Sequence, residues 1–354
     1  MQVTARTLQA PHTGAMKKKA WRRRWQPDSS QSWRRAVQGA FLILNLWIGI
    51  EFFLFVRHLE GNGPFWPRPA GVEGWLPIAG MMNASYWIQT GDVLLVHPAA
   101  MVLFLTFLTL SALFRKAFCG WLCPIGTLSE VLWKFGRDTF RRNFFFPGWL
   151  DIPLRGLKYV LLGLFLWFAA AMPAEAIRQF MESPYGLIAD VKMLGLFRHM
   201  TETTAVVLGV LLLGSFFVPN LWCRYLCPYG ALLGLAAVMS PLRIRRTPEA
   251  CIDCAKCARA CPSQLPVDKL IQIRSAECLG CMECVAICPA ENALAMSAGP
   301  GKSIRPVWLA ASVVGGFLFA GWTRDANGTL AWLDSPRDLP GTRSDRLGLG
   351  ASLA

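Results

Sequence analysis

The chain has 354 residues, of which 54% are hydrophobic and only 16% are charged, and its formal net charge is +14. Disordered chains are poor in apolar residues, and soluble domains carry about 25% charged residues, so the composition excludes disorder and disfavours a soluble enzyme. A nucleic-acid-binding protein would account for the charge but not for the apolar content. A membrane protein with its basic residues on one side accounts for both and needs no nucleic-acid partner.

The N-terminal segment, residues 1–35, is a basic arm that contains the runs Lys17–Lys19 and Arg22–Arg24. We interpret this arm as a cytoplasmic anchor rather than a cleavable signal peptide, because no small-residue cleavage site follows the first apolar run. Nucleic-acid binding by the arm is the weaker alternative, since a charge run beside an apolar helix usually marks membrane orientation.

Four apolar runs predict membrane-spanning helices, which need about 17 to 25 residues. They are Ala36–Val56, Leu94–Phe114, Gly156–Met172 and Thr203–Val218, the last two being at the short end of that range. A fifth run, Val307–Trp322, is short and rich in Gly and Ala. It is either a fifth span or a buried or interfacial helix.

These runs predict a mainly α-helical, polytopic membrane protein with two repeated helix hairpins. The basic arm is followed by a four-helix transmembrane domain over residues 36–240 and by a small, cysteine-rich α+β domain over residues 241–300. Residues 301–354 hold the candidate fifth span and a loose tail.

The distribution of charge predicts the orientation in a bacterial inner membrane. Segments 1–40, 115–158 and 224–305 hold nine, eight and ten basic residues against one, three and six acidic residues. Loops 57–93 and 174–203 hold two and three basic residues against three and four acidic ones. Because cytoplasmic segments carry the excess of Lys and Arg, the N terminus and all twelve cysteines should face the cytoplasm.

Two polar residues near the outer ends of the first two spans are candidates for proton-transfer chemistry, which needs a base at the membrane interface. Glu51 lies within the first span, and an acid inside a membrane is a functional candidate by default. His97 opens the second span on the same side. The alternative is that Glu51 only reaches the outer headgroups and that His97 is a packed residue at a helix start.

Two shorter cysteine motifs each follow a span that runs from outside to inside. Both have the form Cys-x3-Cys-Pro-x-Gly, and they form an internal repeat with a separation of 104 residues, at Cys119, Cys123, Cys223 and Cys227. Two thiolates cannot complete a cluster but four can, which predicts an additional metal or cluster site shared by the two repeats. The alternatives are buried thiols that mark a helix end, or redox-active dithiols.

The other eight cysteines form two runs of the form Cys-x2-Cys-x2-Cys-x3-Cys-Pro, 27 residues apart. This is the bacterial ferredoxin pattern for two [4Fe–4S] clusters, in which the fourth cysteine of each run ligates the other cluster. The predicted ligands are Cys251, Cys254, Cys257 and Cys288 for cluster 1, and Cys278, Cys281, Cys284 and Cys261 for cluster 2. Zinc sites use two ligand pairs set well apart, and disulfides are rare in the cytoplasm, so both are disfavoured.

A basic segment precedes the first of these runs, with Arg243, Arg245 and Arg246. We expect it either to tether the ferredoxin domain to anionic membrane lipid or to dock an acidic partner.

The combination of two Cys-x3-Cys-Pro motifs with a double ferredoxin run resembles the membrane-bound polyferredoxins. This group includes the NapH-type quinol dehydrogenase subunit of periplasmic nitrate reduction, its MauN and YccM relatives, and the membrane iron–sulfur part of NosR. The resemblance covers roughly residues 36–290. The flavin-bearing outer domain of NosR has no counterpart here, and the C-terminal extension favours a YccM-like member. The resemblance implies electron transfer between the membrane quinone pool and a redox partner in anaerobic respiration.

We therefore expect an electron-transfer subunit rather than a stand-alone enzyme. The rival interpretation is an assembly factor for a respiratory oxidase that reduces copper, as the related CcoG does, but no copper-binding motif rich in Met or His is visible. A redox sensor is a third interpretation, and no output domain supports it. The direction of electron flow stays open.

Overall fold

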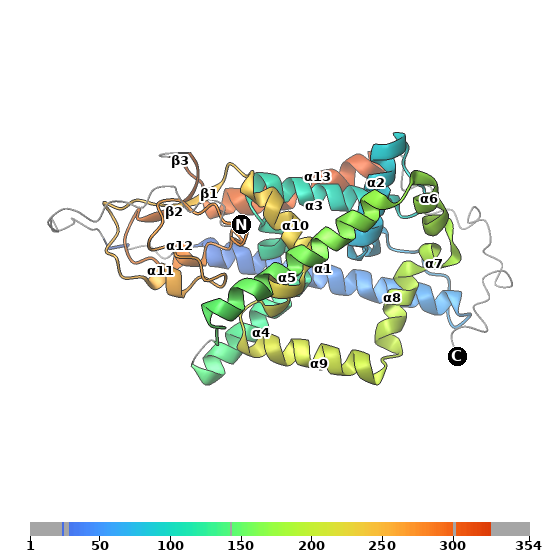
Figure 1. Cartoon of the computed structure of the whole chain (residues 1–354), viewed down its shortest axis with the longest axis horizontal. Coiled ribbons are helices and arrows are strands. Elements are labelled where there is room, and N and C mark those ends of the chain that lie inside the picture. The colour runs from blue at the N-terminus through green and yellow to red at the C-terminus, as the bar shows by residue number, and fades with distance from the viewer. Residues whose placement is uncertain (1–22, 25–27, 142–143, 300–301, 327–354) are drawn as a thin grey trace. The chain divides into compact units, whose positions relative to one another are not determined.

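The structure is a computed structural model that describes residues 23–24, 28–141, 144–299 and 302–326 (Figure 1). Most of the predicted basic arm, and the predicted tail beyond residue 326, lie outside these residues. The chain is mainly helical, as predicted, with one small sheet. The helices are, in order, α1 (Ser30–Leu59), the 3-10 helix η1 (Ala70–Trp75), α2 (Pro77–Thr90), α3 (Pro98–Phe114), the π-helical turn η2 (Phe118–Leu122), α4 (Pro124–Phe140), α5 (Gly148–Ala171), α6 (Ala174–Glu182), α7 (Pro184–Leu187), α8 (Ala189–Arg198), α9 (Glu202–Phe217), the π-helical turn η3 (Trp222–Leu226), α10 (Pro228–Val238), α11 (Lys256–Arg259), α12 (Glu283–Ala286) and α13 (Pro306–Ala326).

Two of the described helices, α1 and α5, are long and apolar enough to cross a membrane. Helices α8 and α9 meet at an angle of 83° and would count as a third span only if the bent pair is taken as one. Helix α3 and the apolar part of α13 are shorter apolar helices. Each predicted span thus falls on a helix, and among the described residues the first and third predicted spans lie on the two helices that are both long and apolar enough to cross.

The predicted span Leu94–Phe114 is shorter in the structure for a physical reason. Helix α3 begins at Pro98, and the preceding His97 has φ of 53°, a left-handed conformation that interrupts a right-handed helix. Leu94 instead packs in a small core with Met82, Ile177 and Met181. The hydropathy of the run could not reveal this break.

The chain divides into two compact units. Unit 1 comprises Met1–Ile43, Phe107–Leu164 and Val206–Gly316 and contains all twelve cysteines. Unit 2 comprises Leu44–Thr106, Phe165–Ala205 and Phe317–Ala354 and contains Glu51 and His97.

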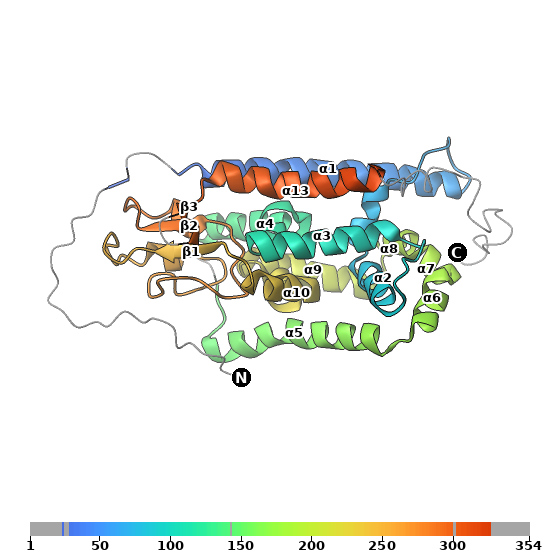
Figure 2. The same cartoon turned by 90° about the horizontal axis from the view of Figure 1, so that it is seen from above.

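The sheet lies in unit 1 and has the strand order β1-β2-β3, as Figure 2 shows. Strand β1 (Arg243–Arg246) pairs antiparallel with β2 (Leu294–Gly299), with Ile244 opposite Met296, and β2 pairs with β3 (Lys302–Ser303). Ile244 and Met296 are both buried. The basic segment with Arg243, Arg245 and Arg246 therefore forms strand β1. Both ferredoxin cysteine runs lie in the chain between β1 and β2.

The first turns of α1 hold several parts of unit 1 together. Arg34 is buried and donates to the carbonyl of Gly120 (2.9 Å), and it also bonds Glu130. Gln31 donates to the carbonyl of Cys281 at 2.9 Å. Arg34 is thus a structural residue of the core, beyond any part it plays in orienting the chain.

Unit 2 contains a buried ion network around Glu73 in η1. The Glu73 carboxylate accepts a hydrogen bond from the backbone amide of Ala100 (3.0 Å), and it lies 3.4 Å from both Arg68 and His97. Arg68 also binds Asp190 at 2.7 Å. Burial alone would raise the pKa of Glu73, but the hydrogen bond with His97 and the charge of Arg68 outweigh it and lower the pKa. The carboxylate is therefore ionised at neutral pH.

We predict that Glu73→Gln lowers the free energy of unfolding by about 3 kcal/mol, because removing one partner of a buried pair leaves the others uncompensated. A carboxyl with a lowered folded pKa stabilises at neutral pH and loses its contribution as the pH falls through that pKa. Thermal unfolding of the purified protein in detergent, at pH 7 and at lower pH, measures both effects. The matched control is Glu60→Gln, since Glu60 pairs with Arg198 nearer the surface and should matter less. Equal losses in both variants would contradict the prediction.

Candidate iron–sulfur centres

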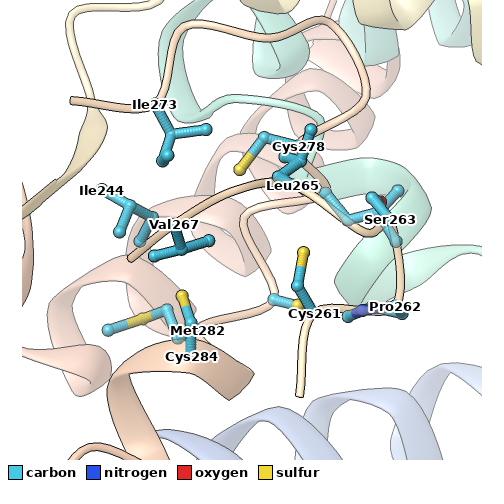
Figure 3. Close-up of a pocket in the computed structure, with 12 residues that line it drawn as sticks. Ile244, Cys261, Pro262, Ser263, Leu265, Val267, Ile273, Cys278, Met282 and Cys284 are labelled. Carbon is cyan, nitrogen blue, oxygen red and sulfur yellow. The ribbon is translucent and has the colours of Figure 1, made fainter. Parts of the chain in front are cut away.

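The two cysteine runs line two separate cavities in unit 1. One cavity is lined by Cys251, Cys254, Cys257 and Cys288. The other is lined by Cys261, Cys278, Cys281 and Cys284, and Figure 3 labels Cys261, Cys278 and Cys284 around it. Each run therefore sends its fourth cysteine to the cavity of the other run. The predicted ligands of each cluster line one cavity, and four thiols are the donor set that holds a [4Fe–4S] cluster; the ligand assignment itself stays a prediction.

The backbone wraps each cavity in the same way. Asp253 and Ala255 in the first run, and Gly280 and Met282 in the second, all have φ between 54° and 63°. Left-handed residues that are not glycine are uncommon, and clusters of them mark functional sites. The short helices that follow, α11 and α12, place the third cysteine of each run. The two halves of the ferredoxin segment are thus equivalent in conformation as well as in spacing.

The two cavities differ in exposure. Cys278, Cys281 and Cys284 are buried, and their cavity is also lined by apolar side chains such as Val267 and Ile273. Cys251 and Cys254 are only partly buried, and charged residues, Lys256 and Asp268, line that cavity. The first cavity is therefore the one closer to solvent.

Each Cys-x3-Cys-Pro motif forms a π-helical turn followed by an α-helix. The turns η2 and η3 hold Cys119 and Cys223, and the second cysteine of each motif is the N-cap of the next helix, with Pro at its first position. Proline suits that position because its missing N–H would have no partner there. Isolated π-helical turns are frequent at functional sites. The two motifs therefore share one local fold, as the sequence repeat predicts.

Glycine closes both motifs, and its structural role differs between the two positions. A Cβ on Gly126 would lie 2.4 Å from the carbonyl oxygen of Cys119, so no other residue fits without movement. The amide of Gly230 donates to Sγ of Cys227 at 3.2 Å. Both contacts keep the start of the following helix close to the sulfur atoms.

The four thiols of these motifs gather at one place. Cys223 interacts electrostatically with Cys119, Cys123 and Cys227, although it comes from a different repeat than the first two. Among the described residues, no three His, Cys, Asp or Glu side chains converge on a point that would hold a single metal ion. A [4Fe–4S] cluster is held by four thiolates, so the two motifs together supply the number and type of donors that a cluster takes.

Both motifs pack directly on the cavity of Cys278. The indole Nε1 of Trp121, a residue with no exposed surface, donates to the carbonyl of Gly280 at 3.2 Å. A Cβ on Gly120 would lie 2.7 Å from the carbonyl oxygen of Leu279, so the backbones touch. From the second motif, Arg224 donates to the carbonyl of Pro262 at 3.0 Å and to Gln264 at 2.7 Å. The second ferredoxin cavity is therefore the neighbour of the four-thiol site.

Three charged residues beside the four thiols were not recognised from the sequence. Lys116 and Lys158 are buried, and Lys158 Nζ binds Glu277 at 2.6 Å. Burial alone would raise the pKa of Glu277, but the charges of Lys116 and Lys158 outweigh it and lower the pKa. The available signal was Lys158 itself, because a charge within a predicted span is a functional candidate.

The structure does not bring Glu51 and His97 into contact. Glu51 is partly exposed on α1 and accepts a hydrogen bond from Nε1 of Trp47 at 2.9 Å. His97 is buried in the Glu73 network, and its Nε2 donates to the carbonyl of Gly186 at 2.9 Å. The sequence did not indicate this network of Glu73, Arg68 and Asp190, because the three residues are distant from His97 in the chain and belong to no motif.

Comparison with known proteins supports this description. A family model described as a 4Fe-4S binding domain matches residues 96–143 and 203–247, which contain both Cys-x3-Cys-Pro motifs, and one described as a 4Fe-4S dicluster domain matches residues 243–289. No solved structure matches the chain.

Among curated proteins, the chain is 52% identical over 251 residues to the putative electron transport protein YccM of Escherichia coli, covering 70% of each protein. It is 28% identical to the methylamine utilization ferredoxin-type protein MauN of Methylorubrum extorquens, covering 54% of this chain and 62% of that protein. It is 26% identical to the ferredoxin-type protein NapH of Escherichia coli, over 42% and 48%. The chain therefore belongs to the family of ferredoxin-type electron transport proteins with 4Fe–4S domains that includes YccM.

Proposed function

We propose that this protein carries electrons between the quinone pool of the bacterial inner membrane and a redox partner protein. The observation that carries the proposal is the grouping of all twelve cysteines into three sets of four within one compact unit. Electron transport through 4Fe–4S domains is the property of the family, and the link to quinone is our addition.

The proposed ligands follow the three groups. Cys251, Cys254, Cys257 and Cys288 hold cluster 1; Cys278, Cys281, Cys284 and Cys261 hold cluster 2; and Cys119, Cys123, Cys223 and Cys227 hold a third. A bound [4Fe–4S] cluster supplies one-electron transfer at a potential that charge, hydrogen bonds and exposure set. The chain supplies the thiolates, and the amide of Gly230 supplies a hydrogen bond to one sulfur.

The order of the three sites follows from their packing. The four-thiol motifs contact the cavity of Cys278 through Trp121 and Arg224. The cavity of Cys251 is the more exposed of the two ferredoxin cavities, which suits exchange with a partner protein. We therefore propose the order four-thiol site, cluster 2, cluster 1 and partner.

The proposed orientation rests on the excess of Lys and Arg in the segments that carry the cysteines. The N terminus and residues 241–300 lie in the cytoplasm, and the helices cross the membrane several times. Membrane lipid then surrounds the apolar helices, and the cytoplasmic partner reaches cluster 1.

A quinol that becomes a quinone gives up two electrons and two protons, so the site needs proton acceptors as well as an electron acceptor. We propose Glu51 and His97 as these acceptors, one proton each. Glu51 is accessible, since it is only partly buried and keeps a single hydrogen bond, to Trp47. His97 is held by Glu73, whose ionised carboxylate favours an additional proton on the ring.

The number of clusters is tested by iron analysis of the anaerobically purified protein. We expect about twelve irons per chain, since a cubane contains four. Cys119→Ser and Cys223→Ser should each reduce the content to about eight, because both remove a ligand of the same cluster. Ser129→Ala, on the helix that follows the first motif, is the control and should keep the full content. A wild-type content of about eight would remove the third cluster from the proposal.

The exchange of the fourth cysteines is tested by electron paramagnetic resonance of the reduced protein. Cys261→Ser should alter the same signal as Cys278→Ser, although the two residues belong to different runs. Cys288→Ser should alter the signal that Cys254→Ser alters. If Cys261→Ser instead affected the Cys254 signal, each run would hold its own cluster.

The quinol link is tested by following cluster reduction after addition of a menaquinol analogue. Glu51→Gln should abolish quinol-dependent reduction and leave the iron content unchanged, because the amide cannot take up a proton. Glu60→Gln serves as the matched control on the same helix end. A normal rate in Glu51→Gln would rule Glu51 out, and reduction of copper in the same assay would favour the assembly-factor interpretation.

A further inference from the structure

Two lysine side chains are buried beside the four thiols. Lys158 is 0% exposed and Lys116 is 2% exposed. Lys158 also lies within α5, one of the two helices with the length and composition of a membrane span. Burying an ammonium group costs several kcal/mol unless opposite charge compensates it, so the position of these two residues needs an explanation.

Among the described residues, Glu277 provides the carboxylate that interacts with both lysines. Glu277 lies 2.6 Å from Lys158 Nζ, and it accepts a further hydrogen bond from the hydroxyl of Tyr159 at 2.9 Å. Lys116 interacts with the same carboxylate electrostatically. Two buried cations therefore share one acid, which leaves a net positive charge within the group.

The sulfur atoms of the four-thiol site are the neighbours of this positive charge. Lys116 Nζ lies 3.7 Å from the position of a Cβ on Gly230 and 3.5 Å from that on Gly234, and Gly230 donates its amide to Cys227. Lys116 and Lys158 both interact electrostatically with Cys119. A cubane held by four thiolates carries a net negative charge, and its potential depends on that charge and its surroundings.

We propose that Lys116 and Lys158 are the counter-charges of the four-thiol centre and raise its reduction potential, with Glu277 opposing them. The proposal rests on the third cluster of the proposed function. A cluster held by these four thiols would supply one-electron transfer without a proton, so the ammonium groups of Lys116 and Lys158 would stabilise its reduced, more negative form. Glu277 directly precedes Cys278, a proposed ligand of cluster 2, which would be the next acceptor. A raised potential suits a centre that receives electrons from quinol.

The test is a redox titration of the full-length protein, followed by electron paramagnetic resonance, together with iron analysis. Lys116→Met should lower the equilibrium constant for one-electron reduction of the four-thiol centre at least tenfold, which is 59 mV for one electron. Lys116→Arg should restore most of the wild-type potential, because the charge is kept. Lys192→Met, which removes an exposed lysine in unit 2, should leave the potential unchanged.

A second variant distinguishes charge from structural damage. Glu277→Gln removes the opposing negative charge and should raise the potential, whereas disturbed packing gives no reason for shifts of opposite sign. If Lys116→Met loses the iron of the four-thiol centre, the Glu277→Gln variant decides instead: a raised potential of that centre supports the proposal, and a lowered one contradicts it. Wild-type iron of about twelve with potentials unmoved in both variants would overturn this inference alone. Wild-type iron of about eight would overturn the third cluster and the inference with it.

Discussion

Much of the structure around the cysteines depends on one constraint, the placement of thiol groups beside apolar helices, where water cannot screen a charge on sulfur. Several features around the four thiols provide positive charge or a hydrogen-bond donor, and Glu277 is the acid that opposes them. A cysteine is the N-cap of both α4 and α10, and the N-terminus of a helix carries partial positive charge. The amide of Gly230 points at a sulfur, and Lys116 lies beside the same turn. The repeat brings two such helix N-termini to one site. It therefore supplies partial positive charge as well as the four thiols.

The same residues that shape the motifs also attach the ferredoxin segment to the helices. Trp121 stands between two cysteines of the first motif and bonds the loop between Cys278 and Cys281. Arg224 stands between two cysteines of the second motif, bonds the chain after Cys261, and pairs with the buried Asp151 at 3.0 Å. Because both contacts are hydrogen bonds to backbone carbonyls, they fix the Cys-x3-Cys-Pro motifs against the loop of Cys278 and the chain after Cys261. Electron transfer depends on the distance between centres, so on the proposed ligand sets these contacts serve the function as well as the fold.

Much of this arrangement could be predicted from the sequence, because cysteine spacing is a strong constraint. The ferredoxin pattern predicts that Cys261 and Cys288 exchange between clusters, and the repeat predicts that the four remaining thiols share a site; both ligand sets stay predictions. The helices also fall where the apolar runs predict them. The left-handed conformation of His97, which shortens α3, could not be foreseen, since it depends on packing between loops. The Lys158–Glu277 pair could not be foreseen either, because its two residues are far apart in the chain and nothing in the sequence links them.

The exchange of cysteines between sites has a consequence for biosynthesis. On the proposed ligand sets, no cluster can be completed from one contiguous stretch of chain. Cluster 1 needs Cys288, and the four-thiol centre needs Cys227, which comes 108 residues after Cys119. All four of these thiols precede Cys251 in the chain, so the proposed four-thiol centre has its complete ligand set before any cysteine of the ferredoxin segment is synthesised. The ferredoxin loop packs against Gly120 and Trp121, which belong to the first motif. The part of the chain that is made first therefore provides the surface against which the later part packs.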